Sequence, residues 1–213
     1  TPTKLSGTLV AGGNVEEVFA LSADGSRVVY RADEAVDNKL ELFSAPVDGS
    51  SARVRLHAAT LATRDVTSFL VAPSGARVVF IANLDTVAAF ELYTVLNTSS
   101  TSTRLSGTMV SGGNVTDVRI SPDGARVVYR ADQGVNQRFE LYSAPIDGSA
   151  APVRLNSTLT PGGDVGQFGR LDCAISPDST TVVYVADQDF DERYELYSVP
   201  IDHATPAVKL NGA

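Results

Sequence analysis

The most regular feature of the chain is a series of short segments in which apolar and polar positions alternate, each bounded by a turn. Residues 114–120 alternate in this way, which is typical of a strand with one buried face. Residues 126–131 and 139–145 are apolar on both faces at their centres, and residues 152–155 close the unit. Proline and glycine within 122–124 favour a tight turn between the first two segments. The pattern predicts four short β-strands.

This unit recurs along the chain at intervals of about fifty residues. The turn and strand at 121–130 (Ser-Pro-Asp-Gly-Ala-Arg-Val-Val-Tyr-Arg) recur at 22–31, 72–81 and 176–185. A second block, Glu-Leu followed by an aromatic residue, begins at Glu41, Glu91, Glu140 and Glu195. A basic residue followed by leucine ends at Leu5, Leu56, Leu105, Leu155 and Leu210. We therefore expect one domain over residues 1–213, with repeats at approximately 6–56, 57–105, 106–155 and 156–210, the last lengthened by residues 166–171.

The repeat determines the expected fold class, which is all-β. Strands that are apolar on both faces need cover on both sides, and no segment has a helical period over ten or more residues. The cover must therefore come from other sheets of the same kind. Four-stranded sheets of 40 to 50 residues that stack face to face are the blades of a β-propeller. A β-sandwich does not require this period, and the coil of a parallel β-solenoid is usually shorter.

The motifs resemble those of a known family. Ser-Pro-Asp-Gly-x-Arg-Val-Val-Tyr, then Glu-Leu-Tyr-Ser-x-Pro-Ile-Asp-Gly, then Val-Arg-Leu is similar to the WD-repeat-like blade of TolB-like bacterial propellers, over essentially the whole chain. Ala23, Ser74 and Ser179 depart from the motif, each in a single turn. The resemblance implies a β-propeller and a periplasmic or secreted setting. The family also supplies propellers attached to prolyl oligopeptidase and dipeptidyl peptidase hydrolases.

The number of outer strands raises the question of how the ring is completed. If each repeat runs from the inner to the outer strand, residues 1–5 supply a fifth outer strand, since the last repeat brings its own at 206–210. Two explanations fit: the chain is a stretch of a longer propeller, or it is a half-ring completed by a second copy. Closure of four blades alone is a less common solution. We expect an eight-bladed ring made by a homodimer, because open end blades would expose apolar faces.

Composition and charge exclude several classes of function. The formal net charge of −8 and a pI of about 4.7 argue against nucleic acid as a partner, because phosphate binding needs a basic face. No apolar run approaches the length of a membrane helix, and the opening Thr-Pro-Thr-Lys is not typical of a signal peptide. With a single cysteine, Cys173, the chain can form neither an internal disulfide nor a multi-cysteine zinc site.

The strongest candidate for chemistry is the acidic connection between the second and third strands of the fourth repeat. It contains Asp187, Asp189, Asp191 and Glu195. Calcium takes six to eight oxygen ligands, which alternating carboxylates in a tight loop can supply. The pattern therefore predicts calcium as the one candidate cofactor. The alternative is an exposed acidic hairpin whose glutamate pairs with an arginine such as Arg138 or Arg193, and the glycine of the better-known calcium loop is absent.

The remaining candidates favour structural roles. His57 and His203 have no repeated acidic or nucleophilic pattern around them and are expected to be surface loop residues. Cys173 lies just before Ile175 in an inner strand and is expected to be a small buried core residue rather than a nucleophile. The glycine pairs beginning at 12, 112 and 162 are typical of turns, and the sequence contains no Gly-x-Ser-x-Gly elbow. No catalytic or cofactor-binding residue is predicted.

Three functions fit these observations. The first is a non-catalytic binding or scaffold propeller for a protein, peptide or glycan. The second is the non-catalytic propeller of a larger secreted hydrolase of the prolyl oligopeptidase type, which would gate or dock its substrate. The third, a stand-alone enzyme, would need polar residues to converge on an axis, and the inner strands offer Glu16, Glu17, Asp117, Arg119 and Asp172, which could equally be solvated charges. We expect the chain not to be an enzyme.

Overall fold

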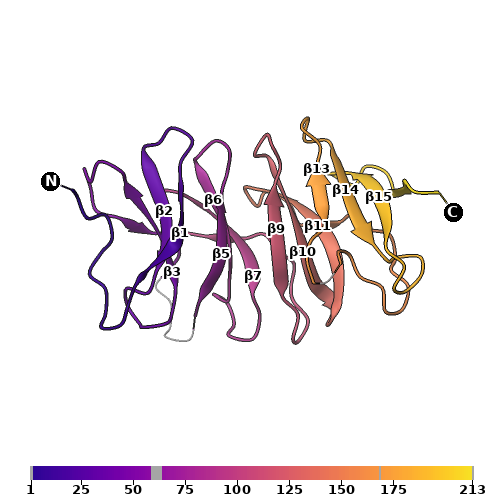
Figure 1. Ribbon diagram of the computed structural model, residues 1–213, viewed down its shortest axis with the longest axis horizontal. Coiled ribbons are helices and arrows are strands. Elements are labelled where there is room, and N and C mark those ends of the chain that lie inside the picture. The colour runs from indigo at the N-terminus through magenta and orange to yellow at the C-terminus, as the bar shows by residue number, and fades with distance from the viewer. Residues whose placement is uncertain (1, 59–63, 168, 213) are drawn as a thin grey trace. The chain divides into compact units, whose positions relative to one another are not determined.

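The computed structural model describes residues 2–58, 64–167 and 169–212. The described residues form sixteen β-strands and no helix, so none provides a helix with the length and apolarity to cross a membrane. The strands make four antiparallel four-stranded sheets, which we number in chain order as sheets 1 to 4 (Figure 1).

Sheet 1 contains β1 (Val15–Leu21), β2 (Arg27–Ala32), β3 (Glu41–Pro46) and β4 (Val54–Arg55). Sheet 2 contains β5 (Val66–Val71), β6 (Arg77–Ala82), β7 (Glu91–Leu96) and β8 (Thr103–Arg104). Sheet 3 contains β9 (Val115–Ile120), β10 (Arg126–Val135), β11 (Arg138–Pro145) and β12 (Val153–Arg154). Sheet 4 contains β13 (Cys173–Ile175), β14 (Thr181–Ala186), β15 (Glu195–Pro200) and β16 (Val208–Lys209).

Each sheet is a simple meander in which consecutive strands are neighbours. The four predicted strands of a repeat therefore form in the predicted order. The register is also repeated: Tyr30 lies opposite Phe43 in sheet 1, and Tyr129 lies opposite Tyr142 in sheet 3. The fourth strand is only two residues long in every sheet.

The turn between the first two strands of a sheet is fixed by local hydrogen bonds. The Ser121 hydroxyl accepts from the Arg126 amide at 2.9 Å and donates to Asp123 at 2.6 Å, while Gly124 takes the positive φ of 72°. Ser179 replaces this glycine in the fourth repeat and adopts the same conformation, with φ 63°. Its hydroxyl accepts from the Asp123 amide at 3.0 Å, a contact that compensates for the strained backbone.

The chain divides into two compact units. The first comprises residues 1–87 and 91–104, and the second comprises 88–90 and 105–213. That the two form one domain stays a prediction. In the first unit, a core joins one face of sheet 1 to the facing side of sheet 2 and contains Val29, Leu42, Leu56, Val66, Phe69, Val78, Phe80, Ala82, Tyr93 and Val95.

The second unit repeats this packing. Val128, Leu141 and Leu155 of the third repeat lie in one buried cluster with side chains of sheet 4. The sheet 4 partners include Val182, Tyr184, Tyr197 and Val199. Within each unit, one face of these apolar strands is therefore covered by a neighbouring sheet, which is part of the cover that the sequence predicts.

Two details differ from the sequence prediction. Residues 2–5 form no strand, although a fifth outer strand was predicted over 1–5. A strand there would need the third strand of a preceding sheet, and the described residues contain none. In the fourth repeat, Val165 keeps the bridge to Ala186, and the Gly166 amide donates to the Val185 carbonyl at 2.8 Å. Residues 167 and 169–171 form no strand, and β13 has three residues. Phe168 of this insertion lies outside the described residues.

Candidate functional site

A buried glutamate paired with a basic residue marks the outer edge of every sheet. The glutamate is the first residue of β3, β7 and β15 and the third residue of β11, and the basic residue comes from the fourth strand of the sheet. The oxygen-to-nitrogen distances range from 2.6 to 2.9 Å for Glu41–Arg55, Glu91–Arg104, Glu140–Arg154 and Glu195–Lys209. Because the glutamates are buried while their partners are half-exposed, the pair anchors the short outer strand to the sheet.

In three of the four sheets a tyrosine hydroxyl donates a hydrogen bond to the second carboxylate oxygen of this glutamate. The hydroxyls of Tyr93, Tyr142 and Tyr197 donate to the Oε2 atoms at 2.8, 2.6 and 3.1 Å. Burial, reinforced by the bond to the carboxylate, raises the pKa of each of these tyrosines. In these three sheets, Oε2 of the carboxylate therefore bonds to a tyrosine and Oε1 pairs with a basic side chain.

Sheet 1 is the exception. Phe43 stands where the other sheets have tyrosine, and its ring stacks on Tyr30 with centroids 5.6 Å apart. The Glu41 Oε1 atom still accepts from Arg55 at 2.9 Å, but among the described residues Oε2 has no hydrogen-bond donor. Glu41 as a whole is 5% exposed, so its side chain is largely buried and Oε2 is left as an acceptor.

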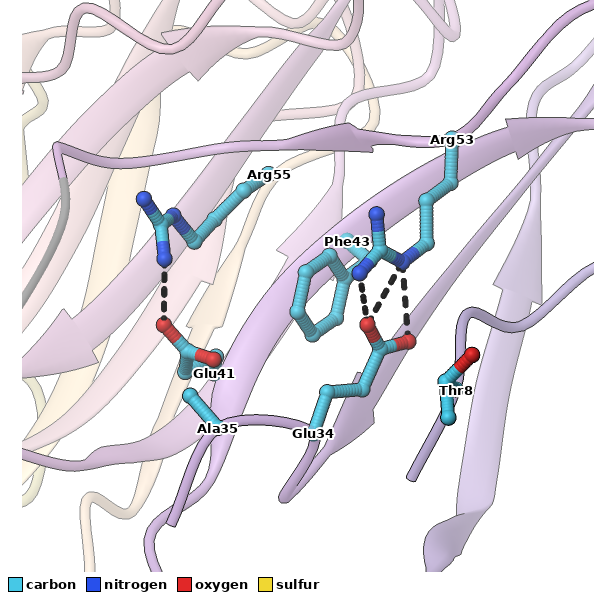
Figure 2. A pocket seen from close by; sticks show the side chains of 7 residues that line it. All are labelled: Thr8, Glu34, Ala35, Glu41, Phe43, Arg53 and Arg55. Carbon is cyan, nitrogen blue, oxygen red and sulfur yellow. Dashed lines mark hydrogen bonds and ion pairs between the residues drawn. The ribbon is translucent and has the colours of Figure 1, made fainter. Parts of the chain in front are cut away.

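This acceptor belongs to a cavity of about 360 Å³ in the first repeat. The cavity is lined by Thr8, Glu34, Ala35, Glu41, Phe43, Arg53 and Arg55 (Figure 2). Figure 2 shows the guanidinium groups of Arg53 and Arg55 directed toward the two glutamates, with Thr8 on the segment that precedes β1. The lining is predominantly polar and carries two carboxylates matched by two arginines.

A second ion pair completes the cavity wall. Arg53 Nε donates to both oxygens of Glu34, at 2.9 and 2.6 Å, and its guanidinium lies over the Phe43 ring at 4.6 Å. The bond to Glu34 raises the pKa of Arg53. Gln133 and Gln188 occupy the place of Glu34 in the third and fourth repeats and accept from the hydroxyls of Tyr129 and Tyr184. Sequence comparison of the repeats could have found the cavity, because Phe43 and Glu34 are the substitutions that create it.

The predicted calcium ligands have partners within the protein. The Asp187 carboxylate accepts from the backbone amides of Asp164 and Glu192, at 2.5 and 3.1 Å. Lys209 binds Glu195 at 2.6 Å and Asp189 at 3.5 Å, while Asp191 lies against Gly162. The described residues contain no group of three or more side chains arranged to hold a metal. Calcium binding by this loop stays a prediction.

The prediction for His57 is wrong. Its side chain is 1% exposed, because sheet 1 needs an acceptor at this position: Nε2 accepts from the Leu42 amide at 3.2 Å. Burial lowers the pKa of the imidazole. His203, by contrast, is exposed in a turn with φ 57°, as expected.

The charged residues of the inner strands make local contacts. Glu16 lies 3.8 Å from Arg31, and Arg119 pairs with Asp117 at 2.5 Å. Asp172 accepts from the Gln167 amide at 3.1 Å, and Glu17 is exposed. Cys173 lies in β13, half-buried against the core, and burial raises the pKa of its thiol to about 12. The thiol is therefore protonated and a poor nucleophile at neutral pH.

Comparisons with known proteins give structural neighbours. No family model matches the sequence, and no curated protein matches it. The structure of dipeptidyl peptidase 4 from Porphyromonas gingivalis matches 91% of the chain at 14% identity, with a TM-score of 0.69. A prolyl endopeptidase matches 94% of the chain at 12% identity, with a TM-score of 0.61. The matched parts are propeller domains. The chain has a β-propeller fold.

The similarity covers only part of each neighbour. A puromycin-hydrolysing peptidase of Mycobacterium tuberculosis matches 89% of the chain at 15% identity, with a TM-score of 0.53. The chain spans 29–31% of the length of these three peptidases. Identity at this level establishes the propeller fold of the chain and leaves its activity, substrates and partners to be proposed.

Proposed function

We propose that this propeller is the non-catalytic module of a hydrolase of the prolyl oligopeptidase type, where it docks the substrate or gates its entry. The observation that supports this function is the extent of the match. Nearly the whole chain aligns with three peptidases but spans less than a third of each. Under this proposal we expect the isolated chain not to hydrolyse peptide bonds.

The test separates binding from turnover. The chain is incubated with proline-containing chromogenic dipeptides, and binding of proline-containing peptides is followed by NMR on the ¹⁵N-labelled chain. We expect no hydrolysis and saturable shifts of a localised set of amides. Hydrolytic activity that co-purifies with the chain through gel filtration, or the absence of any peptide-induced shift at millimolar concentration, would contradict the proposal.

A stand-alone binding propeller for a protein, peptide or glycan is the second candidate. The cavity in the first repeat favours it, because Glu41 Oε2 has no donor among the described residues and can accept from a hydroxyl or amine of a ligand, while the Arg53 guanidinium supplies a positive charge at the cavity wall. We further propose TolB-like membership and a periplasmic or secreted setting, which rest on the repeated motif. Fractionation of the source cells tests the location.

The chain provides its own control for ligand binding at the cavity. Phe43→Tyr places a hydroxyl where the other sheets have one and so satisfies Glu41 from within. Titration with a panel of monosaccharides and dipeptides should identify a ligand whose binding is lost in F43Y and unchanged in Tyr142→Phe. Equal binding by the wild type and F43Y would exclude Glu41 Oε2 as the ligand's acceptor.

A further inference from the structure

One face of sheet 1 is apolar and open. Phe19 is 65% exposed, whereas Phe69, which holds the same register position in sheet 2, is 9% exposed. Val15 and Leu21 on the same face of sheet 1 are also exposed. Large apolar side chains exposed together mark an interaction surface.

This face contains a preformed apolar cavity. Its volume is about 220 Å³, and it is lined by Leu5, Ser6, Val15, Phe19, Val28 and Tyr30. The last four correspond by register to Val66, Phe69, Val78 and Phe80 of sheet 2. Those four residues of sheet 2 lie in one cluster with Leu42 and Leu56 of the first repeat. The cavity therefore corresponds to the place where Leu42 and Leu56 are buried on sheet 2. On sheet 1, Leu5, which ends the same basic-leucine motif as Leu56, already lines it, and a counterpart of Leu42 is missing.

The matching leucines are exposed at the other end of the repeat series, on sheet 4. Leu196 is 38% exposed and Leu210 is 51% exposed. Their counterparts in the first repeat, Leu42 and Leu56, are completely buried. Sheet 4 thus presents exposed leucines, and sheet 1 presents a cavity that lacks a counterpart of Leu42.

The hydrogen bonds between repeats show the same complementarity. In the first unit the Leu40 amide donates to Asp65 Oδ1 at 2.9 Å, and the Val66 amide donates to the Leu40 carbonyl at 2.9 Å. In the second unit the Phe139 amide donates to Asp164 Oδ1 at 2.7 Å, and the Val165 amide donates to the Phe139 carbonyl at 2.8 Å.

At the two ends of the repeat series, the groups equivalent to this donor and this acceptor have no partner among the described residues. Tyr194 precedes β15 as Leu40 precedes β3, and Asn14 precedes β1 as Asp65 precedes β5. Within the described ranges, the Tyr194 amide finds no acceptor and Asn14 Oδ1 finds no donor. One donor and one acceptor of the repeated bond are thus left over, on sheets 4 and 1 respectively.

We propose that sheet 4 of one copy of this chain docks on sheet 1 of a second copy, head to tail. Leu196 enters the cavity beside Phe19 and Leu5, and the Tyr194 amide donates to Asn14 Oδ1. A second copy fits because this chain carries both halves of the junction, with the spacing that its own repeats use. In a closed pair the contact occurs twice. This inference is independent of the proposed function.

The test uses complementation between two variants of the 213-residue chain. Wild type should have a mass near twice 22.4 kDa by light scattering. Phe19→Asp disables the sheet 1 face and Leu196→Asp disables the sheet 4 face, so each variant alone should be monomeric. An equimolar mixture should form a heterodimer, because one intact face of each kind remains. Val135→Asp, at an exposed position outside both faces, should leave the dimer unchanged.

Circular dichroism confirms that each variant is folded before its mass is interpreted. A monomeric wild type at protein concentrations up to about 1 mM would overturn the proposal. It would also be overturned if either aspartate variant alone still dimerised, since the contact would then not be head to tail. A mixture of the two variants that stays monomeric would overturn it as well.

Discussion

The imidazole Nε2 of His57 accepts a hydrogen bond from the backbone amide of Leu42, 3.2 Å away. Asn156 Oδ1 accepts from Leu141 in the same way at 2.8 Å, and Asn211 Oδ1 accepts from Leu196 at 2.7 Å. Because Nε2 is the acceptor, the proton of the neutral ring is on Nδ1, which donates to the Ala58 carbonyl at 2.8 Å. The folded protein therefore holds His57 in its neutral form.

Stability should consequently depend on His57 in mildly acidic solution. Burial lowers the pKa of His57 below its ordinary value of 6.5, so the folded state binds fewer protons than the unfolded state. The contribution to stability is complete above pH 6.5 and is lost as the pH falls below that value. Urea unfolding between about pH 5 and pH 7.5 should show the decline.

The matched variant is His57→Asn, which keeps an acceptor, as Asn156 does, but cannot be protonated. This variant should unfold at a urea concentration that changes little over the same range, while His57→Ala should cost ~1–3 kcal/mol at pH 7 because the Leu42 amide loses its partner. Equal pH dependence in wild type and H57N would assign the effect to other groups.

Phe43→Tyr should stabilise the protein by ~0.5–1.5 kcal/mol, because the new hydroxyl can donate to Glu41 as Tyr93 donates to Glu91. The reverse change, Tyr93→Phe, should destabilise by a similar or larger amount, since Glu91 is buried. Chemical unfolding at pH 7 measures both. A destabilised F43Y would show that the ring cannot take the position of the other tyrosines.

Gly113 should not tolerate a side chain. A Cβ atom there would lie 2.8 Å from the Asp132 carbonyl oxygen. A Cβ at Gly13 or Gly163 would likewise meet the carbonyl oxygen of Asp33 or Asp187. Gly113→Ala should therefore cost ~1–3 kcal/mol. Gly212→Ala, which meets nothing within 4 Å, is the control and should stay within about 0.5 kcal/mol of wild type.

Asp187→Ala should destabilise the protein by ~1–3 kcal/mol whether or not a calcium chelator is present. The carboxylate accepts from the backbone amides of Asp164 and Glu192, so its loss leaves two donors without their partner. Thermal unfolding with EDTA and with millimolar calcium measures the difference. A loss of stability that occurs only with calcium would instead identify Asp187 as a metal ligand.

The repeat made most of the fold predictable. Glycine, proline and serine mark the turns, and the doubly apolar strands require neighbouring sheets, so strand order and blade number follow from local pattern alone. Residues 2–5 were mispredicted because their sequence matches an outer strand, whereas strand formation also needs a neighbour to pair with. Local similarity cannot supply that neighbour.

The site was less predictable, because it arises from departures from the repeat. His57 looks unrelated to Asn156 and Asn211, yet all three provide an acceptor to a leucine amide. Because histidine and asparagine differ in residue type, their shared role as acceptors is not evident from the sequence. The free acceptor of Glu41 likewise results from Phe43 in place of a tyrosine. That substitution can be seen by comparing the repeats, but its effect on Glu41 follows only from the tyrosine contacts of the other sheets.

The hydrogen bond from Leu40 to Asp65, repeated as Phe139 to Asp164, has a consequence for how such a chain can lengthen. Each repeat brings an acceptor for the repeat before it and a donor for the repeat after it. A tandem duplication of one whole repeat would therefore produce a segment whose connections to both neighbours already exist. Growth by complete units requires no compensating mutation at the new boundary, whereas gain or loss of a partial unit would leave a donor or acceptor unsatisfied.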